Sequence, residues 1–136
     1  MTAVFVDTVA FVAINNKNEQ FNAQAVEINR NLLLNEYRYI TSDYVLDETV
    51  TLLRKKAGHA AAVDFYENIQ KSELVQVVHV TETLQHHAWN IFKKYADKEY
   101  SFTDCTSFAI MKELKVHAAF TNDHHFEQMG FDRLIK

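Results

Sequence analysis

The chain has few of the residues that interrupt a compact fold, because it contains no proline, two glycines and one cysteine. This scarcity excludes flexible linkers, collagen-like or low-complexity segments, and slow isomerisation of an X-Pro bond. The single cysteine, Cys105, cannot form an internal disulfide. We therefore interpret it as a small buried side chain of a protein from a reducing compartment.

Long hydrophobic runs are also missing. No apolar stretch reaches the roughly 20 residues that a helix needs to cross a bilayer. The apolar N-terminal stretch is interrupted by Asp7, which stands where a signal peptide would have its hydrophobic core. We expect a cytoplasmic protein without a membrane partner.

An excess of positive charge is absent as well, since the formal net charge is −4 at pH 7. A protein that binds nucleic acid by bulk electrostatics alone relies on Lys and Arg to neutralise phosphates, so the sequence argues against that mode. Any phosphate chemistry would need a metal ion. Basic residues do cluster locally, and we interpret them as solvated helix ends. These residues are Arg54, Lys55, Lys56, Lys93, Lys94 and Lys98.

The length of 136 residues and the 48% hydrophobic content suit a single domain that spans residues 1–136. Segments with strand-like and helix-like periodicity alternate along the chain. This alternation predicts an α/β fold with a mainly parallel central sheet between two layers of helices. The expected strands lie at about 3–6, 37–41, 74–80, 117–121 and 131–135, and the expected helices at about 8–14, 18–35, 43–57, 59–71, 82–95, 103–115 and 126–129.

Four acids stand just past an apolar strand or at the start of the helix that follows it: Asp7, Glu48, Asp104 and Asp123. In an open α/β sheet, ligands bind outside the carboxyl ends of the strands, so these acids can converge on one rim. Gathered carboxylates repel one another unless a cation lies among them, and hard divalent cations prefer oxygen ligands. The pattern predicts a magnesium or manganese site.

Each acid also has a structural explanation. Asp7, Asp104 and Asp123 are placed where they could cap a helix or form a turn. Glu48 borders the apolar face of its helix, where an acid is expensive to bury without a partner. One shared site explains all four positions more simply than four separate coincidences. The neighbouring His124 and His125 could act as an acid or as phosphate ligands, but we interpret them as exposed loop residues. The other histidines lack zinc-ligand spacing.

The acids lie in four segments whose order along the chain resembles that of the PIN-domain ribonucleases, specifically the VapC-type toxins of prokaryotic toxin–antitoxin pairs. The resemblance covers nearly the whole chain. No single segment is specific to the family, but the set of four segments in this order is. One departure is that Val9 and Ala10 follow Asp7 and Thr8 where the family often has a small polar residue. The segments are VFVDT at 4–8, TSDYVLDE at 41–48, SFTDC at 101–105 and FTND at 120–123.

This resemblance implies a PIN-like three-layer α/β/α fold, one or two Mg²⁺ or Mn²⁺ ions, and metal-assisted cleavage of RNA phosphodiester bonds. It also implies a homodimer silenced by a small cognate antitoxin protein. The implied metal ligands are Asp7, Asp104 and Asp123, while Glu48 orients the attacking water or a second ion. Three further residues are candidates for supporting the ligands or contacting phosphate: Thr8, Thr103 and Asn122.

Other classes compete with this interpretation. A haloacid-dehalogenase-type phosphatase would need a second Asp at position 9, where this chain has Val9. A receiver-like phosphoacceptor would need a Lys after the late strand, and none stands there. A catalytically silent PIN-like module, which binds metal, RNA or a partner without turnover, remains the open alternative.

Overall fold

The computed structural model describes residues 2–136 and contains one five-stranded sheet in the order β3-β2-β1-β4-β5. All four pairings between neighbouring strands are parallel. β1 is the central strand, and its Val4 pairs with Tyr39 on one side and Ala118 on the other. The strands are β1 (Ala3–Val6), β2 (Arg38–Ser42), β3 (Val75–Val78), β4 (Ala118–Phe120) and β5 (Asp132–Arg133).

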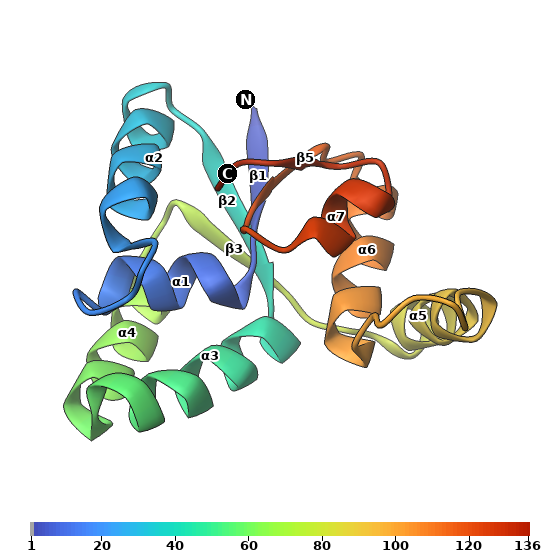
Figure 1. The fold of residues 1–136 in the computed structure, drawn as a ribbon, viewed down its shortest axis with the longest axis horizontal. Helices are drawn as coiled ribbons and strands as arrows, with labels where there is room; N and C mark the ends of the chain where they lie inside the picture. Colours follow the sequence, from blue (N-terminus) through green and yellow to red (C-terminus); the bar gives the residue numbers. More distant parts are fainter. Residues whose placement is uncertain (1) are drawn as a thin grey trace.

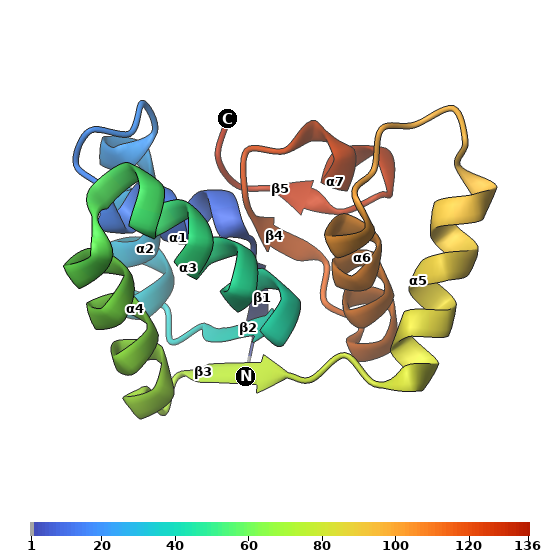
Figure 2. The same cartoon turned by 90° about the horizontal axis from the view of Figure 1, so that it is seen from below.

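Helices cover both faces of the sheet, as Figures 1 and 2 show: α1 to α4 lie on one side and α5 to α7 on the other. The predicted three-layer arrangement is therefore confirmed. No helix within residues 2–136 has the length and apolar character that a membrane crossing requires. The helices are α1 (Thr8–Asn15), α2 (Asn22–Leu34), α3 (Asp43–Ala57), α4 (His59–Lys71), α5 (Glu82–Lys94), α6 (Phe102–Leu114) and α7 (His124–Gln128).

Local chemistry sets the helix boundaries. The Ser42 hydroxyl caps α3 by accepting a hydrogen bond from the backbone N–H of Val45, and Thr81 caps α5 in the same way. Gly58, with φ of 100°, separates α3 from α4 in a conformation that L side chains rarely adopt. These boundaries were predicted. α2 begins later than predicted, because Asn16 first forms a turn with its side chain accepting from the N–H of Asn18.

The core forms where the helices pack against the buried strands. The side chains of Val4, Phe5 and Val6 in β1 have no exposed surface, as expected for a central parallel strand covered on both faces. Because β1 lies between β2 and β4, the chain crosses from one half of the sheet to the other at the β1/β4 boundary. The loops that follow these two strands meet at this switch point, where α/β proteins bind ligands.

Candidate active site

Asp7 is the residue directly after β1, and it is a buried acid with 5% of its surface exposed. Its backbone N–H donates to the carbonyl of Phe120 at 3.2 Å, which joins the ends of β1 and β4. Although Asp7 precedes α1, its side chain makes no capping hydrogen bond. The capping explanation therefore fails for Asp7, and another interaction must compensate the burial of its carboxylate.

Thr121 connects two of the predicted acids. Its buried hydroxyl donates to Oδ2 of Asp7 at 2.9 Å and accepts from the backbone N–H of Asp123 at 3.1 Å. Thr121 follows β4, so the parallel pairing of β1 and β4 brings the two loops together. The hydroxyl fixes one oxygen of Asp7 and the backbone of Asp123 at the same time.

Asp104 lies in the first turn of α6 and forms a capping box with Ser101. The Ser101 hydroxyl accepts from the N–H of Asp104 at 3.0 Å, while Oδ2 of Asp104 accepts from the N–H of Ser101 at 3.1 Å. The box satisfies two backbone donors and holds the Asp104 carboxylate in one orientation. Asp104 therefore has a capping role, and it also faces the other acids.

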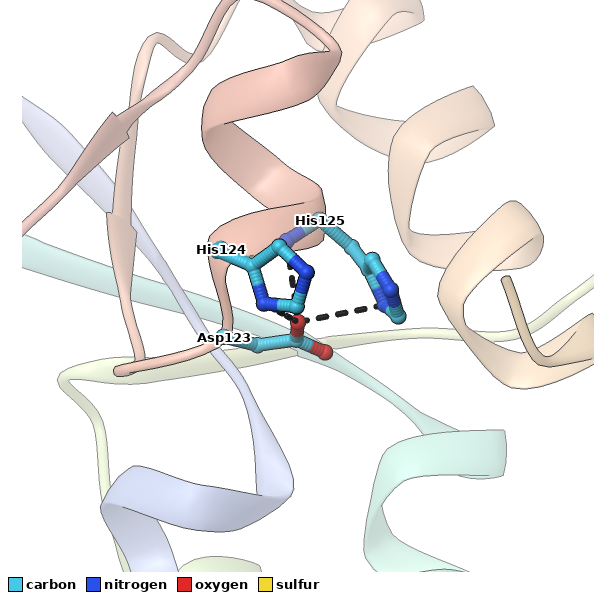
Figure 3. A group of neighbouring side chains, drawn as sticks. All are labelled: Asp123, His124 and His125. Atoms are coloured by element: carbon cyan, nitrogen blue, oxygen red, sulfur yellow. Dashed lines mark hydrogen bonds and ion pairs between the residues drawn. The ribbon is translucent and has the colours of Figure 1, made fainter. Parts of the chain in front are cut away.

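Asp123 begins α7, and two histidines surround its carboxylate, as Figure 3 shows. Its Oδ1 accepts from the backbone N–H of His125 at 2.9 Å, so the predicted capping role is confirmed. Nδ1 of His125 lies 3.2 Å from Oδ1 of Asp123 and 3.6 Å from Oδ2 of Asp104. His124 lies farther away, at 3.9 Å, and its side chain is 66% exposed.

His125 corrects the sequence interpretation, which placed it in an exposed loop. Its side chain is only 16% exposed, and its ring packs edge-to-face against Tyr100 at 5.2 Å. When protonated, the imidazolium supplies positive charge between Asp104 and Asp123. The ligand atoms of Asp123, His124 and His125 lie within 4.8 Å of one another, which makes a tight donor group in the described chain. The interpretation of His124 as exposed is confirmed.

The three aspartate carboxylates lie close enough to shift one another's pKa. Burial, followed by the negative charges of Asp104 and Asp123, raises the pKa of Asp7 to about 7, against the lowering effect of the Thr121 hydrogen bond. Burial and the charge of Asp123 also raise the pKa of Asp104. Three oxygen donors that repel one another in this way suit a hard divalent cation, which would relieve the repulsion.

Glu48 is more exposed than predicted. The sequence placed it at the edge of the core, but its side chain is exposed on α3, as is that of Asp47. Glu48 lines a surface cavity of about 620 Å³ together with Asp47 and Leu52. Thr103, the residue before Asp104, lines the same cavity. The cavity thus connects Glu48 with the start of α6.

The three polar residues predicted to support the site have different surroundings. The Thr8 side chain is buried, and its hydroxyl lies 3.5 Å from the carbonyl of Val45 in α3, so it faces the α1–α3 contact. Thr103 lines the Glu48 cavity. Asn122 accepts from Arg133 through its backbone carbonyl at 2.8 Å, and its side chain is partly exposed.

Sequence reasoning gave Thr121 no role and favoured an exposed loop position for His125 over a functional one. Thr121 stood inside the FTND segment but received no role, although its position at the end of an apolar strand matches that of Asp7. His125 could be found only from the structure, because its contact with Asp104 joins residues from two helices.

A parallel α/β sheet with three mutually repelling aspartates near its switch point is an arrangement suited to a metal-assisted phosphodiesterase. The chain belongs to the PIN domain family, whose model matches residues 4–132. The predicted family and PIN-like fold are confirmed.

Relatives similar to this chain are nucleases. It is 37% identical over 129 residues to the 23S rRNA-specific endonuclease VapC20 of Mycobacterium tuberculosis, a match that covers 94% of this chain and 95% of the relative. It is also 30% identical over 80 residues to a VapC ribonuclease of Archaeoglobus fulgidus, which covers 58% of this chain and 50% of that protein.

Solved structures share the fold. The crystal structure of VapC20 from Mycobacterium tuberculosis, described as a sarcin-ricin loop cleaving toxin, matches with a TM-score of 0.84 at 36% identity and covers 94% of this chain and 95% of that chain. FitAcB from Neisseria gonorrhoeae matches with a TM-score of 0.70 at 16% identity and covers 96% of each chain. This second likeness concerns the fold alone.

Proposed function

We propose that this protein is a metal-dependent endoribonuclease that cleaves RNA phosphodiester bonds as the toxin of a toxin–antitoxin pair. The observation that carries the proposal is the convergence of Asp7, Asp104 and Asp123, with the pKa of Asp7 raised to about 7. Identity of 37% to an rRNA endonuclease over nearly the whole chain supports the reaction class. The name of that relative makes ribosomal RNA the first substrate to test.

In this proposal Asp7, Asp104 and Asp123 hold Mg²⁺ or Mn²⁺, since all three supply hard oxygen donors. When bound, the ion supplies Lewis-acid activation of water and of the phosphate. Thr121 keeps Asp7 and Asp123 in register through the two hydrogen bonds of its hydroxyl. Ser101 keeps the Asp104 carboxylate oriented through the capping box.

Glu48 and the polar residues at the rim act on the substrate side of the same site. From the cavity that it shares with Thr103, the Glu48 carboxylate orients the attacking water or a second ion. Thr103 and Asn122 are partly exposed and can donate to phosphate oxygens. Thr8 instead supports Asp7 by fixing α1 against α3, because its hydroxyl is buried in that contact.

The experiment that tests this function is cleavage of a ribosomal RNA fragment by the purified protein with Mn²⁺, with EDTA, and with Asp104→Asn in parallel. We expect cleavage with Mn²⁺ and none in the other two reactions, because both remove a component of the metal site. Asp132→Asn, which changes an exposed acid in β5, is the matched control and should cleave normally. Cleavage that persists in EDTA would contradict the proposal.

The toxin role includes a homodimer and a small antitoxin that keeps the nuclease silent in the cell. A ribonuclease that attacks RNA of its own host needs such a partner, and the similar VapC20 is described as a toxin. We expect expression of the chain alone to arrest growth and Asp7→Ala to abolish the arrest. Equal arrest by the variant would show that catalysis is not the cause. Light scattering of the purified protein measures the oligomeric state.

A further inference from the structure

The helix α5 carries an aromatic pair that its own fold leaves uncovered. Trp89 and Phe92 are 49% and 41% exposed, and their rings stack with centroids 5.6 Å apart and planes 15° from parallel. Phe102, at the start of α6, packs against the pair with ring centroids 6.5 and 6.4 Å away. The pair is thus held rigidly while its other surface faces solvent, and a contiguous exposed apolar surface of this kind marks an interaction site.

A pocket of about 350 Å³ lies beside this aromatic pair. Tyr100 lines it and is only 6% exposed, yet its hydroxyl has no hydrogen-bond partner among residues 2–136. The pocket is lined by the aromatic side chains of Trp89, Phe92, Tyr95 and Tyr100 and by the basic side chains of Lys93 and Lys98.

The pocket adjoins the acidic site through a short series of side chains. The Tyr100 ring contacts the His125 ring at 5.2 Å, and Nδ1 of His125 lies 3.6 Å from Oδ2 of Asp104. Phe102, which packs on the aromatic pair, is two residues before Asp104 in the same helix. The Tyr100 wall of the pocket is therefore separated from the Asp104 carboxylate by the His125 ring alone.

We propose that this pocket binds a nucleobase of single-stranded RNA next to the cleaved phosphodiester bond. The base stacks on Trp89 and Phe92, and Lys93 and Lys98 contact the flanking phosphates. Lys98 lies 3.5 Å from the carboxylate of Asp97, and because both side chains are exposed, this weak pair can give way to phosphate. The inference rests on the proposed function and adds one nucleotide-binding subsite to the proposed active site.

The charges favour RNA over a second copy of the chain as the occupant. The protein carries a net charge of −4, yet the pocket has two lysines in its lining. An RNA strand brings the opposite charge to these lysines and a flat ring to the aromatic pair.

The test uses the fluorescence of Trp89, which is the only tryptophan of the chain. Asp104→Asn protein in EDTA, which cannot cleave, is titrated with a single-stranded ribooligonucleotide that carries the sequence of a ribosomal RNA loop. We expect quenching of Trp89 emission, and about 10-fold weaker binding when Phe92→Ala removes one stacking ring. Lys93→Ala combined with Lys98→Ala should reduce the slope of log K against log salt by about 1.4.

The matched control is Tyr66→Ala, because Tyr66 is an aromatic residue with 44% exposure on α4, in the opposite helix layer. It should leave RNA affinity unchanged. In the cleaving protein with Mn²⁺, Phe92→Ala should raise KM and leave kcat within about 2-fold, since the ring lies away from the reacting atoms.

Absence of quenching by RNA, or equal affinity of Phe92→Ala and Tyr66→Ala, would overturn the proposal. So would a dimer that Trp89→Ala converts to monomer without a change in RNA affinity, because the face would then belong to a second copy. RNA binding is measured without a metal and cleavage is measured with one. A failure of the nucleobase pocket is therefore distinguishable from a failure of the proposed nuclease function.

Discussion

At the scale of single residues, Asp7 is a carboxylate whose negative charge the folded protein destabilises unless a cation lies nearby. Burial and the charges of Asp104 and Asp123 raise its pKa to about 7, while the hydrogen bond from Thr121 lowers it. Because the effects that raise the pKa outweigh those that lower it, the Asp7 carboxyl of the metal-free folded protein keeps its proton up to about pH 7. In the unfolded chain the same carboxyl loses its proton near pH 4.

This difference predicts how the stability of the metal-free protein depends on pH. Between pH 4 and pH 7 the folded state binds more protons than the unfolded state, so the free energy of unfolding falls as pH rises. We expect Asp7 alone to account for a loss of roughly 3 kcal/mol between pH 5 and pH 8. Urea denaturation in EDTA at several pH values measures it.

Asp7→Asn isolates the contribution, because the amide oxygen can still accept the Thr121 hydroxyl but carries no charge. The variant should be more stable than the parent protein at pH 8 and should lose most of the pH-dependent decline. If the free energy of unfolding fell equally with pH in both proteins, the pKa shift of Asp7 would be smaller than the structure indicates.

Thr121 offers a second prediction at this scale. Thr121→Val keeps the shape of the side chain but removes the hydroxyl that joins Asp7 to Asp123, and it should reduce kcat/KM for RNA by about 10- to 100-fold. Thr121→Ser retains the hydroxyl and should restore most of the activity. Mn²⁺ affinity, measured by calorimetry, should fall with Thr121→Val, and an unchanged affinity would argue against the positioning role.

At the scale of elements, the N-terminus of α6 joins stability to the site. Ser101 caps this helix and is paired reciprocally with Asp104, whereas Thr81 caps α5 without contacting any of the acids. The two caps are chemically similar, which makes them a matched pair for separating helix stability from catalysis.

We expect Ser101→Ala and Thr81→Ala each to lower the free energy of unfolding by about 1 kcal/mol. Only Ser101→Ala should also reduce RNA cleavage, by roughly 10-fold, because it releases the Asp104 carboxylate. Thermal or urea denaturation and a cleavage time course measure the two effects. Equal cleavage by the two variants would mean that the capping box serves only the helix.

At the scale of the whole molecule, the acidic site couples metal binding to folding. A cation that binds only the folded protein adds stability as its concentration exceeds the dissociation constant, by about 2.7 kcal/mol at a hundredfold excess. We therefore expect Mn²⁺ at millimolar concentration to raise the Tm. Asp104→Asn should raise the Tm in EDTA by relieving repulsion and should reduce the response to Mn²⁺. A Tm indifferent to Mn²⁺ would count against the site.

The order of elements could be predicted because it depends on local patterns. Strand and helix periodicity, the caps Ser42 and Thr81 and the break at Gly58 are readable along the chain, and the structure has these elements within a few residues of the predicted bounds. The largest shift, at the start of α2, came from the Asn16 turn, whose side-chain hydrogen bond competes with the helix.

The sequence by itself determined the parallel α/β fold and the placement of Asp7, Asp104 and Asp123, because strand ends and helix starts are local features. Only the tertiary structure decided that Glu48 is exposed, that His125 lies between Asp104 and Asp123, and that Thr121 reaches Asp7. Those contacts join segments up to 114 residues apart. They depend on how β4 pairs with β1 and how α7 packs beside α6, and helical or strand periodicity carries no information about either.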